Sequence, residues 1–217
     1  MKKTPTLALA LAAAVVAAGC ASLAGGPDPH VVAADMVKTG FRSQGIAGVE
    51  RVTQIDETLK ACNAADVAGK PLDAATAKRI EEANLKTIKW PGDGKFLGDW
   101  KEGEKIAQSG RGQTWTDKAG AANGGNSYNC HQITKEEISF GTIGPSLYNY
   151  GKLRGVSDPQ AAASKPIVEY TWGKIWNAKA YNACSNMPRS GHAGILNQDQ
   201  VRHIMALLLD PASPVNQ

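Results

Sequence analysis

The chain has 217 residues, of which 42% are hydrophobic and 20% charged, and its formal net charge is +4. The length predicts one domain with an appendage, and the composition is that of an ordinary globular protein. These values exclude a collagen-like chain, a coiled coil and a long disordered tail. After the N-terminal segment, no stretch approaches the ~20 apolar residues that a membrane-spanning helix needs, so a polytopic membrane protein is also excluded.

The first residues have the pattern of an export signal. Two lysines precede an apolar run over residues 7–18, and small residues follow. This run is too short for a transmembrane helix and is typical of a secretory leader over residues 1–20. Residues 17–20 also resemble a weak lipobox, which makes Cys20 a candidate for lipid attachment; cleavage nearby by an ordinary signal peptidase is the alternative. We therefore expect a periplasmic protein, held at the membrane only if Cys20 is lipidated.

Loss of the leader would lower the formal charge by two, and a nearly neutral mature chain gives no reason to expect nucleic-acid binding. The bacterial periplasm oxidises thiols. Without Cys20, the cysteines that remain are Cys62, Cys130 and Cys184. An odd number in an oxidising compartment indicates that one thiol has another role.

Helical patterns follow an irregular start. The Gly-Gly-Pro-Asp-Pro run at residues 25–29 predicts a tether that extends to about Val52. Asp73 is expected to cap a helix that continues to about Lys89, where Trp-Pro-Gly stops it. The segment that opens at Asp99 fits a capping box, with Glu at the third helical position and Gly110 after the end.

Two further helices are expected near the C-terminus. One runs from about Pro166 to Trp176. Asn197 and Gln200 form a capping pattern before apolar residues spaced i, i+3, i+4 and i+7, and we expect this last helix to pack against the one that begins near Asp99. No alternating strand pattern is convincing. The sequence therefore predicts an all-α chain with long loops, in which a large buried cofactor would help to fill the core.

The stretch Gly-Asn-Ser-Tyr-Asn-Cys-His at residues 125–131 is the most informative for function. A c-type haem is held by the pattern C-x-x-C-H, in which two cysteines form thioethers with the porphyrin and the histidine binds iron. Cys130 and His131 occupy the last two positions, but Ser127 stands at the first, and a hydroxyl group does not form the thioether. Taken alone, the pair is a common dipeptide that is more typical of a structural cysteine beside a surface histidine.

Two downstream features favour the haem interpretation. Pro145 lies in a Gly-Thr-Ile-Gly-Pro-Ser-Leu run, where neighbouring carbonyl groups could accept a hydrogen bond from a ligand imidazole and fix its tautomer. Met187 lies in an Asn-Met-Pro-Arg-Ser-Gly loop, and a thioether sulfur in such a loop is a suitable ligand for haem iron. Each residue alone has an ordinary structural explanation, but the ordered set is hard to obtain by chance.

This order of motifs resembles class I c-type cytochromes and, more narrowly, the SoxX family, the monohaem subunits of SoxAX thiosulfate-oxidising complexes. The resemblance runs from about residue 103 to the C-terminus, with its most specific parts in the Gly-Asn lead-in and the Asn-Ala-Cys-Ser-Asn-Met-Pro run. It implies an N-terminal tether and helical extension over residues 21–98. A class I cytochrome c-like domain with long loops would cover residues 99–217.

The resemblance also implies a ligand set and a function. One haem c would be attached through Cys130, with His131 and Met187 as the axial iron ligands. In SoxAX complexes, the SoxA subunit joins thiosulfate to a cysteine of the carrier SoxYZ, which releases two electrons. This chain would then be the electron-transfer subunit of a SoxAX-type L-cysteine S-thiosulfotransferase. It would form a heterodimer with a SoxA-like cytochrome that holds the catalytic residues, meet the carrier only indirectly, and pass electrons to a soluble cytochrome c.

Ser127 departs from the family pattern and leaves two interpretations open. The haem is retained through the single thioether of Cys130, or its loading is impaired. Ser190 is a lesser departure, at a position where an aromatic residue would be expected, and His192 is a rival iron ligand to Met187. A haemless periplasmic binding or assembly subunit that keeps the fold is the alternative function, and a free cytochrome shuttle is a third.

The cysteine count gives a last expectation once Cys130 is assigned to haem. If Cys20 is lipidated or removed, Cys62 and Cys184 remain, and an even remainder in an oxidising compartment predicts a disulfide. This bond would tie the extension to the loop before Met187. Two buried free thiols are the alternative.

Overall fold

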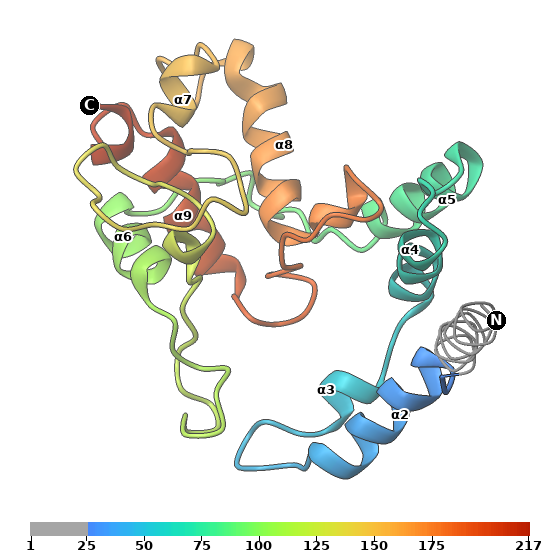
Figure 1. Cartoon of the computed structure of the whole chain (residues 1–217). Coiled ribbons are helices and arrows are strands. Elements are labelled where there is room, and N and C mark those ends of the chain that lie inside the picture. The colour runs from blue at the N-terminus through green and yellow to red at the C-terminus, as the bar shows by residue number, and fades with distance from the viewer. Residues whose placement is uncertain (1–25) are drawn as a thin grey trace, which may run out of the picture. The chain divides into compact units, whose positions relative to one another are not determined.

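The computed structural model describes residues 26–217, so the predictions about the leader and Cys20 fall outside the described residues. Over the described range the chain is helical, and its β-structure is limited to an isolated bridge between Gln44 and Ala47 (Figure 1). The predicted all-α class is therefore confirmed. No helix in this range is long and apolar enough to span a membrane.

The chain divides into two compact units. The smaller unit comprises the chain up to Ser43 together with Val49–Thr53, and it contains α2 (Pro29–Gly40) and α3 (Glu50–Thr53). The prediction of an irregular tether was wrong over these helices. Proline is tolerated at the first position of a helix, where its missing N–H has no intrahelical partner to lose, so Pro29 starts α2 instead of preventing it.

The larger unit, Gln44–Gly48 and Gln54–Gln217, begins with α4 (Glu57–Val67) and α5 (Ala74–Leu85). Each is capped by an aspartate, Asp56 and Asp73 respectively, whose carboxylate accepts a hydrogen bond from an N–H of the first turn at 2.8 and 2.9 Å. These bonds satisfy backbone donors that the helices themselves leave without partners.

The end of α5 comes earlier than the sequence predicted. The helix ends at Leu85, not near Lys89. The hydroxyl of Thr87 donates to the Asn84 carbonyl at 2.7 Å, and Ile88 turns into the core with 7% of its surface exposed. The Thr87 hydroxyl thus supplies the hydrogen bond to a terminal carbonyl that a backbone N–H of the next helical turn would otherwise supply.

Three helices build the core: α6 (Trp100–Gln108), α8 (Lys165–Trp176) and α9 (Gln198–Leu209). All three lie where helices were predicted, and α9 has the predicted reciprocal capping box between Asn197 and Gln200. At α6 only the Asp99 half of the box is present, because the Glu102 side chain pairs with Lys105. Shorter helical segments lie between and after them: η1 (Ser127–Asn129), α7 (Tyr150–Leu153), η2 (Ala162–Ser164), η3 (Ala178–Ala180) and η4 (Pro214–Asn216).

The predicted pairing of the helix at Asp99 with the last helix is present, and a glycine allows it. The backbones of α6 and α9 approach so closely at Gly103 that a Cβ atom there would collide with the His203 carbonyl oxygen. The His203 ring accepts a hydrogen bond from the Asp99 N–H at 2.9 Å, which makes this histidine a part of the helix contact. Together these contacts fix how α6 lies on α9.

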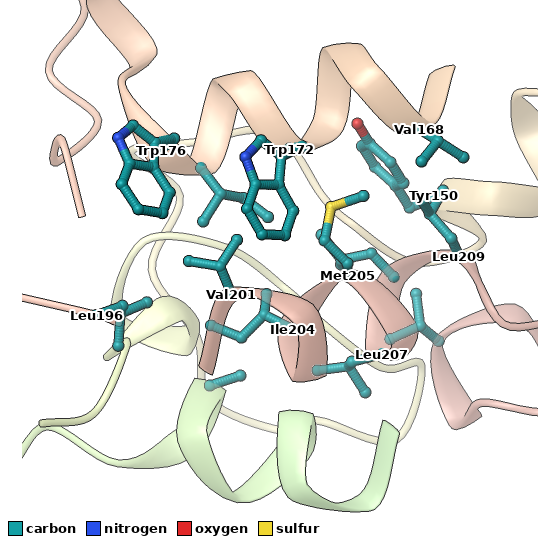
Figure 2. Packing of buried hydrophobic residues seen from close by; sticks show 14 of the residues in the cluster. Tyr150, Val168, Trp172, Trp176, Leu196, Val201, Ile204, Met205, Leu207 and Leu209 are labelled. Atoms are coloured by element: carbon teal, nitrogen blue, oxygen red, sulfur yellow. The ribbon is translucent and has the colours of Figure 1, made fainter. Parts of the chain in front are cut away.

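In the core, α9 lies between α6 and α8 (Figure 2). Trp172 of α8 and Met205 of α9 are both 0% exposed. The Trp172 ring stacks on Trp176 at 5.9 Å between centroids and meets the edge of Phe96 at 5.5 Å, while its Nε1 donates to the Lys89 carbonyl at 3.0 Å. This packed layer is the support behind the loops that carry the candidate site.

Candidate functional site

The glycine–asparagine lead-in, residues 124–126, is bonded to the end of α6. Its last two N–H groups donate to the carbonyls of Ile106 at 2.7 Å and Ser109 at 2.9 Å. A Cβ atom on its first glycine would collide with the Ser109 carbonyl, and its asparagine has a φ of +49°, a left-handed conformation that asparagine adopts more readily than most residues. The sequence of the lead-in therefore fixes where η1 begins.

His131 is held in one tautomer and one orientation. Its Nδ1 lies 2.7 Å from the Pro145 carbonyl oxygen, and its backbone N–H donates to the Ser127 carbonyl at 2.9 Å. Because a carbonyl oxygen can only accept, Nδ1 carries a proton, and in the neutral imidazole Nε2 is then the nitrogen with the lone pair. The hydrogen bond expected near Pro145 is thus present, and Nε2 is the atom left to bind a metal.

Glycines let the loop of residues 141–147 lie against this histidine. The Gly144 N–H donates to the Cys130 carbonyl at 2.8 Å, and a Cβ atom on Gly144 would collide with the His131 ring. At Gly141 the N–H donates to the Tyr128 carbonyl at 2.9 Å, and a Cβ atom would collide with backbone of the η1 segment. The two glycines therefore set the distance between Pro145 and the imidazole.

A methyl group at Gly144 should displace the His131 ring. We expect Gly144→Ala to break the hydrogen bond to Pro145 and to lower the free energy of unfolding by about 1–3 kcal/mol, the usual cost of overpacking. Urea denaturation measures the stability, and the ¹⁵N shifts of the imidazole report its tautomer. Gly92→Ala is the matched control, because a Cβ atom at Gly92 meets nothing within 4 Å. Unchanged imidazole shifts in Gly144→Ala would contradict this account of the loop.

Cys130 precedes this histidine and is half-buried, with no disulfide partner among the described residues. Its N–H donates to the Ser127 carbonyl at 3.0 Å, so η1 holds the two side chains of the truncated motif on one short turn. A thiol and an imidazole with a free Nε2 therefore lie next to each other. The arrangement offers one covalent attachment point and one metal ligand.

Met187 lies on a different loop, half-buried against the hydrophobic core. Trp176 stands behind this loop: a Cβ atom at Gly191 would collide with its indole ring, and its carbonyl accepts from the His192 N–H at 3.0 Å. The Trp176 Nε1 is buried and has no hydrogen-bond partner within residues 26–217. A buried indole N–H usually has an acceptor, so this is a donor open to a bound polar group. No local pattern indicated this donor, because the neighbours of a tryptophan along the chain do not show whether its N–H has a partner.

His192, the rival ligand, is half-buried in the same loop. Partial burial and the positive charge of Arg189 lower the pKa of His192, against the opposing effect of Asp56. The imidazole is therefore neutral at pH 7 and chemically competent to bind a metal. Among the described residues, no group of three or more His, Cys, Asp and Glu side chains could hold a metal ion.

Cys62 and Cys184, the pair left by the cysteine count, form a disulfide with their Cα atoms 5.5 Å apart. The bond joins α4 to the segment just before Met187. It closes a sequence separation of 122 residues. The extension and the methionine loop are thus covalently linked.

No protein-family model matches the chain. A protein of Aquifex aeolicus (strain VF5), named "Uncharacterized lipoprotein", is 34% identical to it over 220 aligned residues, and the alignment covers the whole of both chains. The chain belongs to the family of this lipoprotein. Because the alignment covers both chains in full, the similarity extends over the N-terminal residues as well as over the helical core.

Proposed function

We propose that this lipoprotein-family chain is a haem-binding electron-transfer subunit with a class I cytochrome c-like domain, as its resemblance to SoxX implies. The observation that supports it most is the hydrogen bond from His131 Nδ1 to the Pro145 carbonyl. Metal-bound histidines almost always donate their other N–H to such an acceptor, which orients the ring and raises the basicity of the ligating nitrogen. Here the acceptor comes from a loop that glycines press against the ring.

The side chains present are of the types that a haem group needs, although they lie on separate loops. Cys130 would supply the thioether, and His131 Nε2 and the Met187 sulfur would bind the iron. The buried Trp176 N–H could donate to a polar group of the porphyrin. Ser127 lacks the second thiol, so the attachment would be through one thioether. When bound, haem supplies one-electron redox chemistry.

The work of the chain's own residues is positioning and exclusion of water. His131 donates from Nδ1 and so keeps its lone pair on Nε2. Met187 would supply a sulfur ligand, and ligation by histidine together with methionine would raise the reduction potential. The Trp172 and Trp176 rings, which stack on each other in the core, would keep water from the side of the site that faces them. No residue of this chain is needed as a general acid or base.

The proposed biological setting is a SoxAX-type sulfur-oxidising complex. The partner would be a SoxA-like cytochrome that joins thiosulfate to a carrier-protein cysteine, and the acceptor a soluble cytochrome c. The name of the Aquifex relative supports export to the periplasm and attachment of lipid at Cys20. Labelling with palmitate tests whether lipid is attached at Cys20. The wild-type protein should carry the label, and the Cys20→Ala variant should not.

Ser127 favours a second candidate, a haemless binding or assembly subunit that keeps the fold. Expression with a haem-maturation system separates the two. A Soret band and a pyridine haemochrome spectrum, with an α-band shifted to the red by one unsaturated vinyl group, support haem attachment through Cys130. Ser127→Cys should allow a second thioether to form and so return the α-band to the shorter wavelength of a haem with two thioethers. A colourless wild-type protein would support the haemless function instead, and copurification with a SoxA-like chain separates a complex subunit from a free shuttle.

Replacing Met187 by leucine keeps the side-chain volume and removes the sulfur. The haem-loaded variant should lose the weak absorption band near ~700 nm that is expected of sulfur-bound haem iron, and its reduction potential should fall. Met36→Leu is the control, because Met36 is 64% exposed and lies in the smaller unit. If the band survives in Met187→Leu, Met187 is not the ligand, and a spectrum of two bound imidazoles would identify His192.

A further inference from the structure

The loop that carries Met187 is fastened to the two N-terminal helices of the larger unit at three points. The first is the Cys62–Cys184 disulfide from α4. The second is an ion pair between the Arg189 guanidinium and the Asp56 carboxylate at the start of α4, with a nitrogen–oxygen distance of 2.6 Å. The third is a hydrogen bond from the Ala183 N–H to the Glu81 carboxylate of α5 at 3.1 Å. We call these contacts the clamp.

The ion pair of the clamp is better shielded from solvent than most on the surface. The Arg189 side chain is 19% exposed and that of Asp56 41%, whereas the Lys60–Glu57 pair on the same helix is 61% and 87% exposed. Shielding reduces the screening by salt that makes exposed pairs weak. Partial burial raises the pKa of Asp56, but the hydrogen bond from the Leu59 N–H and the Arg189 charge outweigh it, so the carboxyl is ionised at neutral pH.

The clamp is itself held by the core. The Asn177 side chain, which is fully buried, donates to Asn84 and Thr87 at the end of α5, at 2.9 Å in each case. The buried Lys179 donates from η3 to the carbonyls of Ala183 and Ser185 at 3.4 and 3.2 Å. The loop is therefore bonded on one side to α4 and α5 and on the other to the segment that follows α8.

The fastened positions, residues 183, 184 and 189, lie on both sides of Met187. We propose that α4 and α5 act as a clamp that fixes the Met187 loop, with Asp56 and Glu81 as positioning residues for its sulfur. The assignment of the sulfur as an iron ligand rests on the proposed function; the fixing of the loop does not. A thioether carries no charge that would attract it to a metal ion, so fastening of its loop on both sides would help to keep the sulfur in place.

Hydrogen exchange tests the clamp whether or not haem is bound. Asp56→Asn removes the charge but keeps a good helix cap, since asparagine caps as well as aspartate. Asp73→Asn is the matched control, because Asp73 caps α5 in the same way and its carboxylate lies in no ion pair that the described residues form. In the full-length, oxidised protein, amides of residues 183–192 should exchange about threefold to tenfold faster in Asp56→Asn than in wild type. Asp56→Glu, which keeps the charge, should restore part of the protection.

The same variants give a second readout in haem-loaded protein. The band near ~700 nm should disappear at a lower temperature in Asp56→Asn than in wild type, while the circular dichroism of the helices persists, because the loop opens before the fold does. Equal exchange in Asp56→Asn and Asp73→Asn would overturn the clamp. A wild-type protein without haem would instead overturn the proposed function. In that case the comparison of amide exchange rates between Asp56→Asn and Asp73→Asn would still show whether the clamp fixes the loop.

Discussion

Replacing Cys62 and Cys184 together by serine should lower the free energy of unfolding by about 3–5 kcal/mol, the range that the chain-entropy model gives for long loops. The bond spans 122 residues, so its loss returns much conformational freedom to the unfolded chain. In a protein of this length, each kcal/mol changes the melting temperature by about 2–4 °C. The double variant should therefore melt roughly 6–20 °C below the oxidised wild type.

Scanning calorimetry without reductant measures this difference. Cys130→Ser is the control, because it removes a thiol and leaves the disulfide intact. Non-reducing peptide mapping of the wild type should recover the two cysteines in one linked peptide. Recovery of Cys62 and Cys184 as separate alkylated peptides, or an unchanged melting temperature in the double variant, would be inconsistent with a structural disulfide.

Trp172→Ala should cost about 3–5 kcal/mol, as truncation of a buried aromatic ring usually does. Trp172 is fully buried, stacks on Trp176, meets Phe96 edge-on and donates to the Lys89 carbonyl. Alanine would leave a cavity between α8 and α9 and an unpaired carbonyl at Lys89. Trp172→Phe keeps one ring and loses the hydrogen bond and part of the buried volume, so it should cost less than alanine.

Urea denaturation of the oxidised protein gives these free energies. Trp115→Ala serves as the control, because the Trp115 side chain is 55% exposed. Its truncation should change stability little. A cost for Trp172→Ala as small as that of the control would mean that this ring does not support the core.

Local signals in the sequence were reliable where the structure uses local contacts. The capping box of Asn197 and Gln200 and the cap of Asp73 were predictable, because each joins residues within one turn. The end of α5 was not, since it depends on the side-chain bond of Thr87 and on the burial of Ile88. The helix α2 was missed because its proline-rich start was interpreted as a break and not as a first turn.

In the candidate site, too, contacts between residues near in the chain could be predicted, whereas contacts between distant residues could not. The hydrogen bond of His131 could be expected, because a proline-containing loop after Cys-His supplies carbonyl groups close to the ring. The ion pair of Asp56 and Arg189 could not, since nothing local marks two charges that are far apart in the chain as partners. The open N–H of Trp176 likewise depends on what packs around the indole in three dimensions.

The disulfide also bears on the order in which the protein must mature. On the proposed export with the N-terminus first, the thiol of Cys62 would emerge before Cys130, and Cys184 would emerge last. A bond from Cys62 to Cys130 would close a shorter loop and so cost less entropy than the native bond. The native pair is favoured only once α8 and η3 have placed Cys184 beside α4. Correct oxidation therefore comes after the core has folded, and early capture of Cys130 by another group would remove the competing partner.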